Sequence, residues 1–147
     1  MAHSYTNLLY HIVFATKDRR PLIAEAFQPR LYEYLGGTVR GLKGVCLEVG
    51  GVQDHVHILA KLHPTMAVSE FLEKFKSNSS KWAKTVSRDF GWQAGYSAFT
   101  VSESQVERVR EYIKNQVEHH RKHTFEEELV ALLKAHGVAY DPNHLWT

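Results

Sequence analysis

The stretch Val52-Gln53-Asp54-His55-Val56-His57-Ile58-Leu59-Ala60 decides how this chain is expected to fold. Its apolar, β-branched residues are typical of a strand, and the preceding Gln53-Asp54 pair is typical of a turn or bulge. Side chains at positions i and i+2 of a strand point to the same face of the sheet. The imidazoles of His55 and His57 are therefore expected side by side, with Val56 pointing into the core. Two histidines on a rigid strand form half of a metal site.

Three more runs of residues are rich in β-branched and aromatic side chains, which predicts strands. With the histidine strand, expected over 55–62, the predicted strands span residues 7–16, 44–52 and 95–101. Apolar residues at helical spacing predict two helices between these strands, from residue 23 to about 42 and across 68–86. Gly36-Gly37 lies inside the first helix, where it would end or bend it.

The C-terminal part of the chain is predicted to be helical. Ser102 to Gln105 and Thr124 to Glu127 both resemble capping boxes. They would open a third helix reaching about His123 and a short fourth helix ending at His136-Gly137. The element order is β-α-β-β-α-β with two added C-terminal helices. It predicts the α+β class with a ferredoxin-like or RRM-like antiparallel sheet, in which the histidine strand is central.

Composition limits the class of protein. The 147 residues fit one domain over 1–147, and 44% hydrophobic with 23% charged residues is normal for a globular chain. A net charge of +2 permits local basic patches without proving a nucleic-acid partner. Cys46 is the only cysteine, which excludes disulfides within the chain and cysteine-rich zinc sites. We expect a cytoplasmic protein, because there is no signal-peptide pattern and no run of about 18 apolar residues.

The predicted third helix carries a second group of reactive side chains. Tyr112 and Gln116 are four residues apart and should share one face. Val106, Val109, Ile113 and Val117 form an adjoining apolar stripe that is expected to pack on the rest of the protein. Tyr112 would then lie between a buried seam and open surface, where a nucleophile can meet a large substrate.

In these features the chain resembles the single-tyrosine HUH transposases, the small enzymes of insertion sequences that move as single-stranded DNA. The resemblance rests on His55-Val56-His57, the helical Tyr112-x-x-x-Gln116, the strand end near residues 95–102, and the element order. It covers nearly the whole chain. A His-hydrophobe-His tripeptide alone is common by chance, so the combination with the tyrosine helix carries the argument.

The resemblance implies a metal-dependent reaction. His55, His57 and Gln116 match the residues that hold one Mg²⁺ or Mn²⁺ in this family, and Tyr112 matches the nucleophile. Attack by the tyrosine would leave a free 3′-OH and a 5′-phosphotyrosine. A phenol has a pKa of about 10 and needs help to ionise near neutral pH. The ion is the obvious source of that help, and His120 and Glu111 are the candidates for a general base.

The resemblance also implies partners. Family members are homodimers that recognise imperfect DNA hairpins, and their tyrosine helix can serve the other subunit. Residues 101–104 could act as the hinge for such an exchange, although they include no glycine. Basic and aromatic side chains suit single strands. The candidate DNA contacts are Lys17, Arg19, Arg20, Lys74, Lys81 and Lys84, with Trp92 or Tyr96 as stacking platforms.

Other interpretations remain open. His55 and His57 can be ordinary strand histidines, Gln116 a solvated helix residue, and the lysines of the second helix a solvated face. We expect His119, His120 and His123 to form a surface cluster rather than a ligand set. A non-catalytic RRM-like nucleic-acid-binding module shares the element order, but the glycine-aromatic signature of that motif is absent. A domesticated HUH nickase acting on host repeats would share the chemistry and differ in substrate.

Overall fold

A computed structural model describes residues 2–147, and its centre is a four-stranded antiparallel sheet. The strands are β1 (Leu9–Ala15), β2 (Val45–Val52), β3 (His55–Lys61) and β4 (Ser97–Val101). Their order across the sheet is β2-β3-β1-β4, and every neighbouring pair is antiparallel. The α+β, ferredoxin-like prediction is confirmed. The strand with both histidines is a central one, hydrogen-bonded on both sides.

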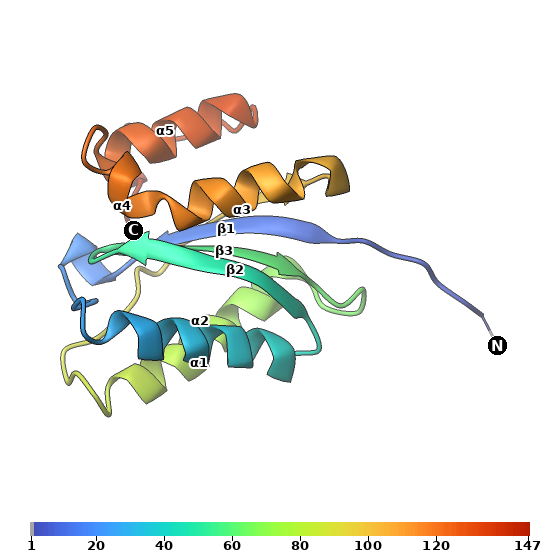
Figure 1. The fold of residues 1–147 in the computed structure, drawn as a ribbon, viewed down its shortest axis with the longest axis horizontal. Coiled ribbons are helices and arrows are strands. Elements are labelled where there is room, and N and C mark those ends of the chain that lie inside the picture. Colours follow the sequence, from blue (N-terminus) through green and yellow to red (C-terminus); the bar gives the residue numbers. More distant parts are fainter. Residues whose placement is uncertain (1) are drawn as a thin grey trace.

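Helices cover both faces of this sheet (Figure 1). The helices α1 (Gln28–Gly41) and α2 (Val68–Ala83) lie on one face. The opposite face carries α3 (Val106–Lys114), the single turn α4 (Gln116–His119) and α5 (Phe125–Ala135). Short 3-10 turns occur at Lys17–Arg19, Glu103–Gln105 and Pro142–His144. Within residues 2–147 no helix has the length and apolar character needed to cross a membrane.

The pleat of β3 separates the core from the candidate site. Val56 and Ile58 are fully buried in the larger hydrophobic core, which fills the space between the sheet and the α1–α2 layer. His55 and His57 are equally buried but point to the opposite face, as period-two alternation requires. A second, smaller core there joins the sheet to α5, through Val13, Ala15, Phe99, Phe125, Leu129 and Leu133. The histidine pair is thus enclosed between the sheet and the C-terminal helices.

Several predicted boundaries are wrong in informative ways. The first helix begins at Gln28, five residues later than expected, and passes through Gly36-Gly37 without a break. The predicted third helix is interrupted at Asn115, whose backbone is no longer helical (φ −94°, ψ 23°). Ser102 makes no side-chain cap hydrogen bond, and a 3-10 turn rather than an α-helix follows it. The second capping box is confirmed: Glu127 N donates to Thr124 Oγ1 and Thr124 N donates to Glu127 Oε1, both at 3.1 Å.

Candidate active site

His55 and His57 are held in fixed orientations by partners behind them. His55 Nδ1 lies 2.8 Å from Asp54 Oδ1, and His57 Nδ1 lies 2.8 Å from Nε2 of His11 on β1. Both imidazoles therefore present Nε2 to the same space between the sheet and α5. The ring of Phe125 stacks on His55 with centroids 3.6 Å apart. Hydrogen-bond partners on the ring nitrogen that does not bind the metal determine the tautomer and the orientation of a metal-binding histidine.

The interruption at Asn115 separates Tyr112 and Gln116 onto two helices, yet both side chains reach the histidine pair. Gln116 is buried, and its Oε1 lies 3.1 Å from His55 Nε2. The Tyr112 ring lies edge-on to His57 with centroids 5.8 Å apart. Of the predicted apolar stripe, Ile113 is buried, whereas Val117 is 55% exposed because the helix direction changes before it.

The group at the centre of the site is Glu128, which sequence reasoning missed. Its carboxylate is buried and accepts hydrogen bonds from the Tyr112 hydroxyl and, at 2.9 Å, from Gln116 Nε2. His57 Nε2 lies 3.0 Å and His55 Nε2 3.3 Å from Glu128 Oε1. His55, His57 and Glu128 together form a group able to hold a metal ion. The detectable signal was an acidic residue on the apolar face of α5, three positions after Phe125 and directly before Leu129.

Burial and mutual charge shift the ionisation of this cluster. Burial lowers the pKa of His57 to about 4, against the opposing charge of Glu128. Burial also disfavours the charged forms of His55 and Glu128, but their partners outweigh it. Asp54 and Glu128 raise the pKa of His55, and hydrogen bonds from histidines hold the pKa of Glu128 below its usual range. Burial and the nearby Glu128 charge raise the pKa of Tyr112.

The structure corrects the expectation for two of the three helical histidines. His120 Nε2 lies 3.2 Å from Glu128 Oε1, and His119 Nε2 lies 3.4 Å from the other carboxylate oxygen, so both belong to the cluster. His123 is exposed, as expected. Of the two candidates for a general base, His120 faces the site, whereas Glu111 is exposed with its Oε1 3.8 Å from the Nζ of Lys114.

The basic residues predicted to contact DNA lie in two separate places. Lys17 and Arg20 are exposed beside the loop that packs on Asp54, near the histidines. Arg19, between them, is engaged by Asp54 and by the ring of Trp146, 4.3 Å from its guanidinium. The other three candidates, Lys74, Lys81 and Lys84, are exposed at α2 on the opposite layer.

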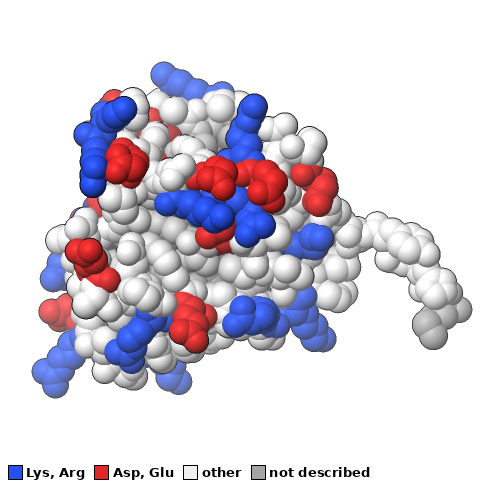
Figure 2. Space-filling model, in the orientation of Figure 1, with Lys and Arg blue, Asp and Glu red and all other residues white. Residues whose placement is uncertain are grey.

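Charge is unevenly mixed on the face shown in Figure 2. Over α3, basic and acidic side chains alternate, and Arg110 and Lys114 both lie within 4 Å of Glu48. Along the lower edge of this view, over α1 and α2, basic side chains predominate and acidic side chains also occur. The surface over α3 is thus nearly balanced in charge.

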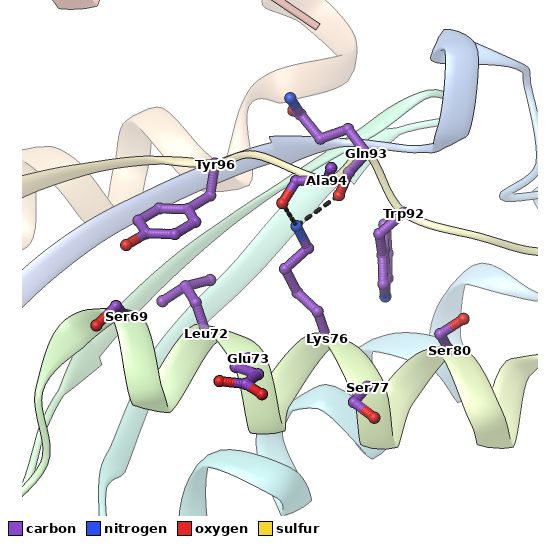
Figure 3. A pocket seen from close by; sticks show the side chains of 10 residues that line it. All are labelled: Ser69, Leu72, Glu73, Lys76, Ser77, Ser80, Trp92, Gln93, Ala94 and Tyr96. Atoms are coloured by element: carbon purple, nitrogen blue, oxygen red, sulfur yellow. Dashed lines mark hydrogen bonds between the residues drawn. The ribbon is translucent and has the colours of Figure 1, made fainter. Parts of the chain in front are cut away.

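A pocket of about 380 Å³ lies away from the histidines, between α2 and the loop before β4 (Figure 3). Lys76 points across it, and its Nζ donates to the backbone carbonyls of Gln93, Ala94 and Gly95 at 2.5 to 2.9 Å. Trp92, predicted as a stacking platform, is instead buried, with Nε1 donating to Ser79 Oγ. Tyr96 is 39% exposed and remains accessible.

Comparison with known proteins gives the class. Residues 4–116 match the family described as "Transposase IS200 like". The transposase for insertion sequence element IS200 of Salmonella typhimurium is 35% identical over 131 residues, covering 80% of this chain and 82% of that protein. The ISDra2 transposase TnpA of Deinococcus radiodurans is 26% identical over 119 residues, covering 74% and 84%. The fold and the matched residues define a transposase. This chain belongs to the IS200-like transposase family.

Solved structures agree on the fold. A protein of Deinococcus radiodurans R1 assigned as a transposase superposes with a TM-score of 0.63 at 22% identity, covering 79% of this chain and 96% of that one. A REP-associated tyrosine transposase bound to a REP hairpin superposes with a TM-score of 0.58 at 15% identity, covering 81% and 73%. At these identities the superpositions show only that the fold is shared.

Proposed function

We propose that the whole chain, residues 1–147, is one HUH single-tyrosine transposase domain. It cleaves and rejoins single-stranded DNA at the ends of an insertion sequence through a 5′-phosphotyrosine intermediate. One observation carries this proposal: the Tyr112 hydroxyl and the Nε2 atoms of His55 and His57 converge on the same buried carboxylate. Membership of the transposase family supports a reaction on DNA.

The residues present suit a divalent cation. The two Nε2 atoms and Gln116 Oε1 face one space, and nitrogen and oxygen donors of this kind accept Mg²⁺ or Mn²⁺. Bound there, the ion would polarise the scissile phosphate and offset the charge that builds up on it. The side chains that orient His55 and His57 are Asp54 and His11, so their role is to keep both Nε2 atoms directed at that space.

Cleavage by Tyr112 exchanges one phosphoester bond for another. The Tyr112 oxygen attacks the phosphorus, the bond from phosphorus to the 3′ oxygen breaks, and the phenol gives up one proton while the leaving 3′ oxygen gains one. The tyrosine ester keeps a phosphodiester-type linkage, so a 3′-OH can later attack it and rejoin strands without ATP. Because burial and Glu128 raise the pKa of Tyr112, the phenol is protonated in the free protein and gives up its proton only when cation and DNA are bound.

The proposed substrate is single-stranded DNA with hairpin ends. Lys17 and Arg20 stand near the histidines and are suited to the strand being cleaved, because exposed cations there can bind phosphates. Lys74, Lys81 and Lys84 lie on the other layer and are suited to the duplex stem. Homodimerisation is a further part of this proposal and rests on the family resemblance alone.

The nucleophile is tested by Tyr112→Phe. The variant should form no covalent adduct with a 5′ DNA end, because the attacking oxygen is missing, while binding to a hairpin stays nearly unchanged. A denaturing gel with labelled single-stranded DNA detects the adduct, and His57→Ala should abolish it as well. An adduct formed by the phenylalanine variant contradicts the assignment. A wild type that binds hairpins but never forms the adduct would favour the non-catalytic module.

A further inference from the structure

Glu128 is a buried carboxylate without a permanent cationic partner. Its side chain is 1% exposed, and within residues 2–147 all its ion pairs are with histidines. A buried anion is costly unless it is paired with a cation or surrounded by donors. A neutral histidine donates a hydrogen bond to a carboxylate but carries no charge. The environment therefore leaves negative charge for which an external cation is the natural counterpart.

The spacing of the donor atoms fits the same conclusion. Ligands bound about 2.1 Å from an octahedral ion lie about 3 Å from their neighbours in the coordination shell. Glu128 Oε1 lies 3.0 Å from His57 Nε2 and 3.3 Å from His55 Nε2, and His55 Nε2 lies 3.1 Å from Gln116 Oε1. These atoms are already spaced as neighbouring ligands of one ion.

The two oxygens of Glu128 have different surroundings. Oε1 faces His55 and His57, whereas Oε2 accepts from the Tyr112 hydroxyl and from Gln116 Nε2. One carboxylate can therefore bind an ion through the first oxygen and keep the nucleophile hydrogen-bonded to the second. The distance between the phenol and the ion would then be fixed by a single planar group.

The C-terminal helix is anchored so that Glu128 is held in this position. The Thr124–Glu127 capping box fixes the start of α5. The Phe125 ring lies between His55 on one side and Trp146 near the chain end, with centroid distances of 3.6 and 4.6 Å. A residue on the first turn of an anchored helix has little freedom to withdraw.

We propose that Glu128 is a fourth protein ligand of the divalent cation and a positioning residue for Tyr112, which makes α5 part of the active site. This inference rests on the proposed function, since it concerns the cation assigned there. The competing interpretation is that Glu128 serves only as a hydrogen-bond acceptor for the surrounding histidines.

The test is the affinity of the metal-free protein for Mn²⁺, measured by calorimetry and by the loss of the free-ion paramagnetic resonance signal. Glu128→Gln keeps the shape and one acceptor oxygen but removes the charge, and should weaken Mn²⁺ binding about tenfold or more. Glu126→Gln removes an exposed charge two residues away on the same turn and should bind as the wild type does.

The outcomes distinguish the two proposals. If Glu128→Gln is folded by circular dichroism and binds Mn²⁺ as tightly as the wild type, while His57→Ala does not bind, the ligand role of Glu128 is overturned and the proposed function stands. If the wild type forms no covalent DNA adduct but Glu128→Gln still loses Mn²⁺, the metal site stands and the proposed function fails. Glu128→Asp, which keeps the charge with a shorter reach, should bind Mn²⁺ better than the glutamine variant.

Discussion

At the scale of single residues, His11 shows how the site depends on a side chain behind its proposed metal-binding histidines. It is 4% exposed, and its Nε2 lies 2.8 Å from His57 Nδ1, which leaves His57 Nε2 for the cluster. Burial, with a smaller contribution from His57, lowers the pKa of His11 to about 3, while Glu128 opposes the shift and His136 adds to it. The folded protein therefore keeps His11 neutral at a pH where the unfolded chain protonates it.

This shift predicts a pH dependence of stability. Between pH 6.5 and about 3 the unfolded state binds a proton at His11 that the folded state does not, so the free energy of unfolding falls as the pH falls through that window. One such group changes the free energy of unfolding by about 1.4 kcal/mol per pH unit within that window. His11→Gln should flatten the dependence measured by urea unfolding in chelator, whereas His3→Gln, at an exposed position, should not. An unchanged slope in His11→Gln would contradict this account.

At the scale of the elements, the tyrosine helix depends on a close approach to the sheet. Gly50 on β2 is buried beneath α3, and a Cβ added there would overlap the carbonyl oxygen of Ile113 and lie 2.8 Å from its Cγ2. Ile113 directly follows Tyr112. The absence of a side chain at Gly50 therefore determines how closely this part of α3, and with it the Tyr112 hydroxyl, approaches the sheet. Any displacement of α3 moves the phenol away from the histidines.

Gly50→Ala should therefore affect stability and reaction together. We expect a loss of about 1–3 kcal/mol in the free energy of unfolding, the usual cost of overpacking, and less covalent DNA adduct in the folded variant. Gly41→Ala is the matched control, because a Cβ at that position meets no atom within 4 Å. Chemical unfolding and the adduct gel measure the two effects. Full adduct formation by Gly50→Ala would show that α3 docking does not position Tyr112.

The sheet and most elements were predictable because their signals are local. Alternation around Val56 placed His55 and His57 on one face, and the Thr124–Glu127 box opened α5 where the sequence indicated. The break at Asn115 was not predictable, since the residues on both sides favour a continuous helix. After the break Gln116 is buried and donates to Glu128, while Val117 is exposed, and these tertiary contacts have no signal in the local sequence.

Glu128 was missed for a related reason. Helical periodicity says which face of α5 is buried but not what that face meets, and an isolated acidic residue there gives no spacing pattern with His55 and His57. Only the packing of α5 on β1 and β4 brings the carboxylate within 3.0 Å of His57 Nε2. In the family that the chain resembles, the third ligand corresponds to Gln116, so the resemblance does not point to a ligand on α5.

At the scale of the whole molecule, one chain contains every group of the candidate site. Tyr112 and Gln116 both donate hydrogen bonds to Glu128, and Gln116 and Glu128 contact the histidine pair of their own chain. The linking segment 102–105 is a short 3-10 turn with no glycine, and α3 is packed on β2 of the same chain. Exchange of the tyrosine helix between two subunits would break these contacts, including the burial of Ile113.

The expected arrangement is therefore a tyrosine acting beside its own histidines, even where two copies associate. Tyr112→Phe and His57→Ala each lack one half of the site, so a co-expressed mixture of the two should form no more covalent DNA adduct than either variant alone. Wild type co-expressed with His57→Ala, which shows that mixed assemblies stay active, is the control. Restored adduct in the mixture of the two inactive variants would mean that one subunit's tyrosine reaches the other's histidines, and that α3 leaves its place over Gly50 in the reacting complex.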